Sequence, residues 1–170
     1  MLLIAGSLRQ LSFSALMEVY AGSNLEKARE EYFREPEAVG LRLAEEDFYG
    51  YLSRVFFTEQ GSVYAIWVEK ERYVSALRLE RWQNGLLVTG LETAPDCRGR
   101  GYAGMLIRAV LEKYPGENIY SHVHRENKAS LAVHEHCGFQ RILEYSRYLD
   151  GSVNRRACTL LRPGIGQTIK

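Results

Sequence analysis

The seven residues from Arg98 to Gly104, Arg-Gly-Arg-Gly-Tyr-Ala-Gly, are the part of this sequence best suited to binding an anion. Glycines let backbone N–H groups approach a ligand without side chains in the way, and arginines add positive charge. The stretch from Leu106 to Leu111 then places its apolar residues on one stripe of a helix. A helix that begins at such a loop adds unpaired first-turn N–H groups and the positive end of its dipole. The loop therefore predicts a site for a phosphate or pyrophosphate.

Other interpretations of the same glycines stay open. Gly99, Gly101 and Gly104 also spell G-x-G-x-x-G, which is typical of dinucleotide-binding folds. That fold places its glycines directly after the first strand and an acidic residue about 20 residues further on. Here residues 94–98 separate the loop from the preceding strand-like run, and the next such run ends in His-Val-His-Arg. We therefore keep a nicotinamide-dependent oxidoreductase, and a loop that opens a helix without a ligand, as alternatives.

Two segments in this region resemble known family motifs. The run from Leu91 to Ala103 resembles motif A of the GNAT superfamily of N-acetyltransferases, in which a strand is followed by Pro, Arg/Gln-x-x-Gly-x-Gly/Ala and a helix. The run from Asn127 to Phe139 resembles motif B, a short helix that starts at Asn and closes with Gly-Phe. The motifs have the usual order and separation and together cover roughly residues 86–140. The N-terminal half matches the family only in its order of elements.

The resemblance implies acetyl-CoA as the cofactor. In the family, strands four and five splay apart, and the strand that residues 91–93 match pairs with the pantetheine arm and its thioester. The glycine loop would hold the pyrophosphate, and Asn127 would contact the cofactor, cap its own helix, or do both. The cofactor-binding residues implied by the resemblance are Leu91, Glu92, Thr93, Arg98, Gly99, Arg100, Gly101, Tyr102, Ala103, Gly104 and Asn127.

Acetyl transfer to an amine requires a group that removes a proton from the ammonium, whose pKa is near 10. His122 is the first candidate base, because it lies five residues before Asn127, where some family members place a catalytic carboxylate. An imidazole suits this task at neutral pH, although a half-buried structural histidine is an equally plain interpretation. Glu92 is the second candidate, or else a residue that recognises the amine. His134 occupies the position where the family commonly has a tyrosine acid, so we expect it to serve the leaving sulfur if an acid is needed.

The resemblance implies an N-acetyltransferase that acts on a primary amine of a small molecule or amino acid by direct transfer. Neither Cys97 nor Cys137 is placed as an activated nucleophile. A protein or peptide amine and a non-catalytic acyl-CoA-binding domain stay open as alternatives. Several of the eleven tyrosines would suit an aromatic acceptor pocket, or would be ordinary core and surface residues: Tyr49, Tyr51, Tyr145 and Tyr148.

The elements needed to position these residues are those of an α/β (α+β) fold. We expect one domain over residues 1–170, with a single mixed, mostly antiparallel sheet of about seven strands, helices on both faces, and strands four and five splayed. The pair Asn84-Gly85 is the best hairpin signal. The expected strands are 9–16, 62–69, 73–82, 86–93, 119–124, 141–149 and 155–161, and the expected helices are 18–33, 38–58, 101–114 and 127–137.

Composition, net charge and cysteine content limit the class of protein and the kinds of partner that we expect. Hydrophobic residues make up 46% and charged residues 25% of the 170 residues, which is typical of a soluble globular protein. A net charge of +1 argues against nucleic acid as the main partner. Three cysteines without metal-site spacing predict reduced thiols, no metal and a cytoplasmic location. No signal peptide and no membrane span are expected, and the protein would be a monomer or a homodimer.

Overall fold

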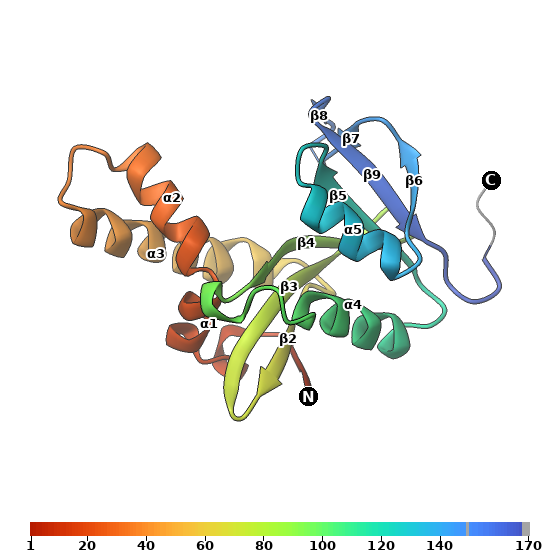
Figure 1. Cartoon of the computed structure of the whole chain (residues 1–170), viewed down its shortest axis with the longest axis horizontal. Coiled ribbons are helices and arrows are strands. Elements are labelled where there is room, and N and C mark those ends of the chain that lie inside the picture. The colour runs from red at the N-terminus through yellow and green to blue at the C-terminus, as the bar shows by residue number, and fades with distance from the viewer. Residues whose placement is uncertain (149, 168–170) are drawn as a thin grey trace.

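A seven-stranded sheet in the order β1-β2-β3-β4-β5-β9-β6 forms the centre of the molecule (Figure 1). The computed structural model describes residues 1–148 and 150–167. A separate pair of very short strands, β7 (Ser146–Arg147) and β8 (Val153–Asn154), forms a small hairpin. The strands of the main sheet are β1 (Leu2–Ala5), β2 (Val63–Glu69), β3 (Arg72–Trp82), β4 (Gly85–Thr93), β5 (Asn118–His124), β6 (Gln140–Leu143) and β9 (Ala157–Arg162).

All neighbouring strands are antiparallel except β4 and β5, which are parallel. This pair is registered only over residues 85–88 against 118–121, after which the two strands separate. The arrangement confirms the predicted mixed, mostly antiparallel sheet with splayed strands four and five. The second half of β4 therefore has one edge bonded to β3 and one edge free of β5.

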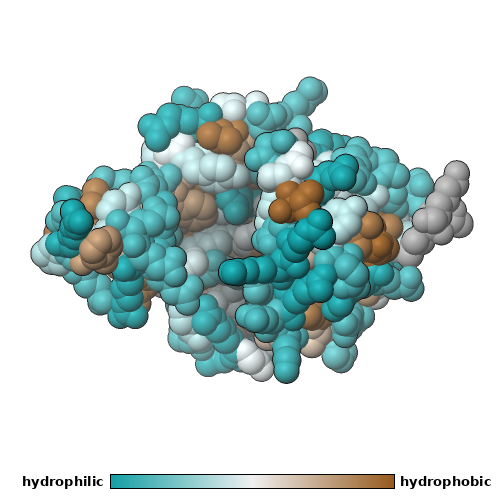
Figure 2. Space-filling view, turned by 90° about the horizontal axis from the view of Figure 1, so that it is seen from above, coloured by the Kyte–Doolittle hydropathy of each residue, from teal (hydrophilic) through white to brown (hydrophobic). Residues whose placement is uncertain are grey.

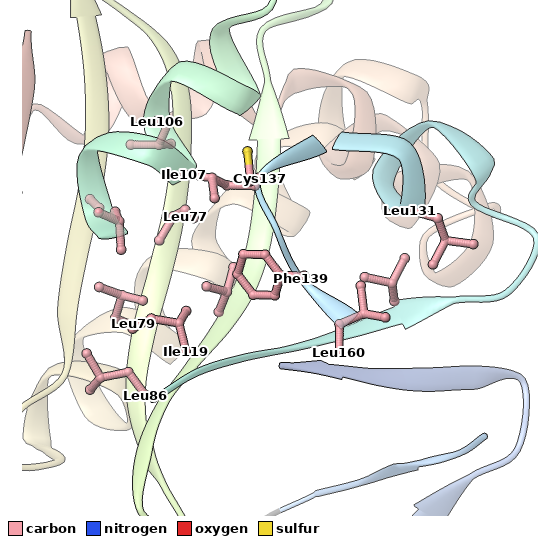
Figure 3. Packing of buried hydrophobic residues seen from close by; sticks show 14 of the residues in the cluster. Leu77, Leu79, Leu86, Leu106, Ile107, Ile119, Leu131, Cys137, Phe139 and Leu160 are labelled. Carbon is pink, nitrogen blue, oxygen red and sulfur yellow. The ribbon is translucent and has the colours of Figure 1, made fainter. Parts of the chain in front are cut away.

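Helices cover both faces of the sheet, as predicted (Figure 1). α4 and α5 lie on one face, and the N-terminal helices lie on the other. In Figure 3, Leu106 and Ile107 of α4 point toward the sheet residues Leu77 and Leu79, so that one apolar stripe of the helix closes the core. The helices are α1 (Phe13–Val19), α2 (Ala21–Glu31), α3 (Glu37–Arg54), α4 (Tyr102–Lys113) and α5 (Lys128–His136), with 3-10 turns at Leu8–Gln10, Phe56–Thr58 and Pro95–Cys97.

The N-terminal region differs from the sequence prediction. Residues 9–16 do not form the first strand, because β1 is the preceding apolar run and α1 begins at Phe13. The side chain of Ser12 caps α1 by accepting a hydrogen bond from the N–H of Ala15, and the buried residues that follow have helical rather than alternating spacing. The single helix expected over 18–33 is divided at Tyr20, which ends α1 and begins α2. The third helix stops at Arg54 rather than continuing to residue 58.

Two further boundaries were wrong. The β3–β4 turn consists of Gln83 and Asn84, and Gly85 is already paired in the strand. Gln83 carries the positive φ of the turn, 50°, whereas Gly85 is needed because a Cβ there would collide with the carbonyl of Asn118 in β5. The strand expected over 141–149 is two short strands, β6 and β7, and residue 149 lies outside the described residues. Among the described residues, no helix combines the length and apolar character needed to cross a bilayer.

Candidate active site

The glycine loop adopts a backbone that other residues rarely reach. Gly99 and Gly101 have φ values of 75° and 80°, and Gly101 directly precedes the first turn of α4 without any side-chain cap. A Cβ at either glycine would meet no atom within 4 Å, so the space above the loop is open. Backbone N–H groups at the start of an uncapped helix are unpaired donors and attract anions. The loop can therefore accept a phosphate group from its open side.

A groove of about 750 Å³ runs along this loop, between α2 and β4 on one side and α5 on the other. Figure 2 shows the surface hollowed between the lobe of α2 and α3, at the left, and the body of the molecule. Arg98 lines the groove, with its Nε donating a hydrogen bond to the carbonyl of Thr93 at 3.2 Å. The groove residues are Gly22, Ser23, Glu26, Leu91, Glu92, Thr93, Cys97, Arg98, Gly99, Gly101, Tyr102, Ala103, Gly104, Asn127, Ala129, Ser130 and Val133.

A bulge in β4 shapes the strand side of the groove. Ala76 of β3 is paired with Glu92, but Arg78 is paired with Thr89, so β4 holds one extra residue in this interval. Gly90 takes up the bulge with a φ of 57°. Beyond Val88 the β5-facing edge of β4 is unpaired, and residues 91–93 line the groove there. This edge presents backbone groups to whatever occupies the groove.

Asn127 has one of the two roles that the sequence allowed, that of a helix cap, and its contact with a cofactor stays a prediction. Its Oδ1 accepts a hydrogen bond from the N–H of Ser130 at 3.0 Å, which caps α5. Asn127 also lines the groove, together with Ser130 from the first turn of the same helix. The cap therefore fixes the end of α5 that faces the glycine loop.

A second hollow of about 380 Å³ adjoins the groove on the face of the sheet covered by the N-terminal helices. Ser23 and Glu92 line both spaces, so the two meet at these residues. Burial raises the pKa of Glu92, and the nearby Ser23 and Arg98 oppose that shift. The hollow is lined by Tyr20, Ser23, Asn24, Lys27, Ala44, Asp47, Phe48, Tyr51, Arg78, Gly90 and Glu92.

His122, the first candidate base, lies apart from both spaces. Its ring packs edge-on against Trp82 at 5.1 Å and Tyr148 at 5.6 Å between centroids. Both ring nitrogens are buried and have no hydrogen-bond partner among the described residues. Burial lowers the pKa of His122, which favours the neutral ring. The structure thus places this histidine among aromatic rings, outside the residues that line the groove or the hollow.

His134 lies in α5, and its side chain is almost fully buried beneath the helix. Its Nδ1 lies 2.8 Å from the carbonyl oxygen of Ser130, so Nδ1 carries the proton and donates to that oxygen. Nε2 is buried without a partner among the described residues, and the ring packs edge-on against Phe139 at 5.0 Å. Burial lowers the pKa of His134. Its helix neighbours Ser130 and Val133 line the groove, but His134 does not.

All of the predicted cofactor-binding residues except Arg100 line the groove, although their contact with a cofactor stays a prediction. Sequence reasoning named no site residue of the α2 wall and, apart from Glu92 and Tyr51, none of the second hollow. Of the four tyrosines considered for an acceptor pocket, Tyr51 lines the hollow, whereas Tyr49 lines a separate surface depression. Two signals were available in the sequence: Arg78 is a charged residue between two leucines of β3, and Gly90 interrupts β4.

The remaining chemistry-bearing residues are dispersed. Cys97, Cys137 and Cys158 are buried free thiols. Within residues 1–148 and 150–167, no three histidine, cysteine, aspartate or glutamate side chains come together in a way that could hold a metal ion.

Comparison with known proteins gives a family and a fold. The model of the Acetyltransferase (GNAT) family matches residues 23–139. Among curated proteins, no sequence matches this chain. The fold is similar to the ribosomal-protein-S18-alanine N-acetyltransferase from Escherichia coli, with 15% identity, a TM-score of 0.56, and 96% of this chain and 94% of the other covered.

Two other solved structures match with similar coverage. The PaiA N-acetyltransferase from Thermoplasma acidophilum, in complex with coenzyme A, has 14% identity and a TM-score of 0.58, with 96% of this chain and 99% of the other covered. A spermidine N-acetyltransferase SpeG chimera from Vibrio cholerae and hSSAT has 18% identity and a TM-score of 0.56, with 94% and 93% covered. At these identities the likeness shows a shared fold.

Proposed function

The chain belongs to the acetyltransferase (GNAT) family, and from this premise we propose that it transfers an acetyl group from acetyl-CoA to a primary amine of a small molecule. One observation carries the proposal: the groove beside the glycine loop and a separate hollow meet at Ser23 and Glu92. Such an arrangement lets two substrates reach one another from different sides. Direct transfer between them then needs no covalent intermediate on the protein.

The groove suits coenzyme A in its donors and in its shape. The backbone of Gly99 and Gly101 and the free N-terminus of α4 would hold the pyrophosphate, with Arg98 adding positive charge. The unpaired edge of β4 at residues 91–93 would bond to the amide-bearing arm. When bound, acetyl-CoA supplies the acetyl group as a thioester with a thiolate leaving group. The relative crystallised with coenzyme A supports this assignment.

We assign the proton transfer to Glu92 ahead of His122. Glu92 lines both the groove and the hollow. An amine bound in the hollow and facing the groove would therefore lie beside the Glu92 carboxylate. A raised pKa makes this carboxylate a better proton acceptor than an exposed one, because basicity rises with the pKa of the conjugate acid. His122 faces Trp82 and Tyr148 instead and stays the second candidate.

His134 is proposed to support α5 behind the groove, and its role as an acid stays a prediction. Its Nδ1–H is already donated to Ser130, and its Nε2 is buried. Departure of coenzyme A as the thiolate does not depend on a strong acid, because the thiolate of a thiol with a pKa of about 8.5 is a good leaving group. The three free, buried cysteines favour a reducing compartment such as the cytoplasm.

The test is release of free coenzyme A thiol from acetyl-CoA in the presence of a panel of primary amines, with each product identified by mass spectrometry. We expect acetylated amine and thiol in equal amounts. Acetyl-CoA binding without product for any amine would instead favour the non-catalytic acyl-CoA-binding alternative. Acetylation of peptide N-termini in preference to small amines would favour a protein acceptor, as in the relative that acts on ribosomal protein S18.

A further inference from the structure

Arg78 is an unusual residue for the middle of a sheet. It lies in β3 between Leu77 and Leu79, and it lines the hollow. Its guanidinium lies over the bulge of β4, where a Cβ on Gly90 would come within 2.8 Å of Nη2. An arginine is charged at every physiological pH, so this position holds a fixed positive charge inside the hollow.

Aromatic rings hold the guanidinium in place. Cζ of Arg78 lies 5.0 Å from the ring centre of Tyr51, 5.8 Å from that of Phe48 and 5.9 Å from that of Phe56. Such contacts stabilise a cation but satisfy none of its N–H donors in the way an acceptor oxygen does. The rings therefore fix the direction of the guanidinium without neutralising its charge.

The charge of Arg78 has no anionic partner among the described residues. No carboxylate of these residues lies within ion-pair distance of the Arg78 guanidinium, and no atom of these residues accepts a hydrogen bond from it. Nε of Arg78 is buried without a partner among them. The nearby Glu80 is hydrogen-bonded to Tyr51 and Thr89 instead. A buried donor without an acceptor is costly, which is why such groups point to a ligand.

Three other charged residues among those described line the hollow: Lys27, Asp47 and Glu92. Lys27 and Asp47 form a salt bridge of 2.9 Å, and Tyr32 donates a further hydrogen bond to Asp47. This leaves Arg78 and Glu92 as the two charged residues of the hollow that are not in a salt bridge within the described chain. They have opposite signs and lie on neighbouring strands on either side of the bulge.

From this arrangement we propose that the acceptor is an amine that carries a carboxylate, such as an amino acid, with the carboxylate bound by Arg78 and the amine directed to Glu92. The inference rests on the proposed function and specifies its substrate class. Arginine binds a carboxylate through two parallel N–H donors, which would satisfy the guanidinium and orient the amine at the same time. An amine without a carboxylate would leave the guanidinium without an acceptor and bind more weakly.

The experiment compares three forms of one acceptor: L-phenylalanine, L-phenylalaninamide and phenethylamine, with parallel sets built on leucine and lysine. Rates are expressed per concentration of unprotonated amine, because the amide and the amino acid differ in amine pKa. For at least one set we expect kcat/KM for the amino acid to exceed that for its amide by about 10²-fold, mainly through KM. Arg78→Gln should bring this ratio close to one, because only the amino acid has a carboxylate whose partner is lost.

Two further variants separate recognition from folding. Arg81→Gln, on the same strand but exposed and paired with Glu117, should leave the ratio unchanged. Arg78→Lys keeps the charge and should keep part of the preference, which a merely structural role would not require. A wild-type ratio near or below one in every set overturns the inference while acetylation itself stands. A wild-type enzyme that acetylates no amine at all overturns the proposed function, and the inference with it.

Discussion

The groove beside the glycine loop is formed largely by backbone, whereas the hollow beneath α3 is formed by side chains. The groove depends largely on backbone: the loop at Gly99 and Gly101, the first turn of α4 and the open edge of β4. The hollow depends on side chains from α2, α3, β3 and β4, which are far apart in the sequence. A backbone surface suits a ligand that is the same in every reaction. A side-chain surface can be changed one residue at a time, which suits a ligand that differs between enzymes.

The largest effect is expected where the two regions meet. Glu92→Gln should lower kcat by about 10²-fold or more, because the amide cannot accept the proton. In the wild type, kcat/KM should rise with pH through the raised pKa of Glu92, and this acidic limb should disappear in the variant. Steady-state rates across pH measure both quantities.

The same variant should not be less stable at neutral pH. A carboxyl group with a raised pKa in the folded state stabilises the fold at low pH and loses that contribution as pH rises through its folded pKa. Removing the charge should therefore hold or raise Tm. His122→Gln is the matched control and should keep the acidic limb; if His122→Gln removes it and Glu92→Gln does not, the base is His122.

A substitution in the glycine loop should weaken the binding of acetyl-CoA and leave the binding of the amine unaffected. Gly101→Asp puts a carboxylate into the open space at the start of α4 and should raise the Kd for acetyl-CoA at least about tenfold, which calorimetry on the folded variant would measure. Gly166→Asp is the control, because Gly166 has a nearly equal φ of 82°, also has open space, and lies near the far end of α4. Equal affinities in the two variants would mean that the phosphates bind elsewhere.

A smaller effect should separate the two arginines of the loop. Arg98 lines the groove and is held by its bond to Thr93, whereas Arg100 does not line it. Arg98→Gln should weaken acetyl-CoA binding by about three- to tenfold, in line with a partly exposed charge–phosphate contact, and Arg100→Gln by less than about twofold. The difference should shrink at high salt. A stronger effect from Arg100 would show that the loop contacts the phosphates from its outer side.

The smallest effect is expected behind the groove, at His134. Because burial lowers its pKa, the neutral ring stabilises the fold above about pH 6.5, and this contribution is lost as pH falls through the folded pKa. His134→Phe should therefore reduce the fall in Tm between about pH 7.5 and about pH 5. If the residue only supports α5, His134→Phe and His134→Tyr should have equal kcat. A kcat that is retained by Tyr and lost by Phe would assign the acid role to this position.

The backbone features of the groove could be predicted from the sequence, whereas the side-chain lining of the hollow could not. The loop, α4 and the cap at Asn127 are local features, so the residues that form them are adjacent in the chain and could be recognised from it. The splayed strands were expected from the family resemblance and are confirmed by the short register of β4 against β5. Arg78 and Glu92 are brought together only by the pairing of β3 with β4, so the hollow could not be predicted from spacing.

The errors also have physical causes. β1 is an edge strand of only four residues, which is too short for alternation to reveal it. α1 and α2 follow one another through Tyr20, and a bend between two helices leaves the local spacing of apolar residues almost intact. His122 and His134 stay candidates, but their burial could not be predicted. That of His122 depends on Trp82, far away in the chain, and that of His134 on how α5 packs against Phe139.

The hydroxyl of Tyr20 connects the helices of the hollow to the strand that borders the groove. It donates a 2.6 Å hydrogen bond from the α1–α2 junction to the carbonyl of Gly90 at the bulge. The helices that wall the hollow are thereby tied to the strand whose other edge lines the groove. A shift of the bulge on filling the groove would reach the helices in part through this bond, and by thermodynamic linkage the effect is reciprocal. Tyr20→Phe should therefore reduce the factor by which each bound ligand changes the Kd of the other, which titration of one ligand with and without the other would measure.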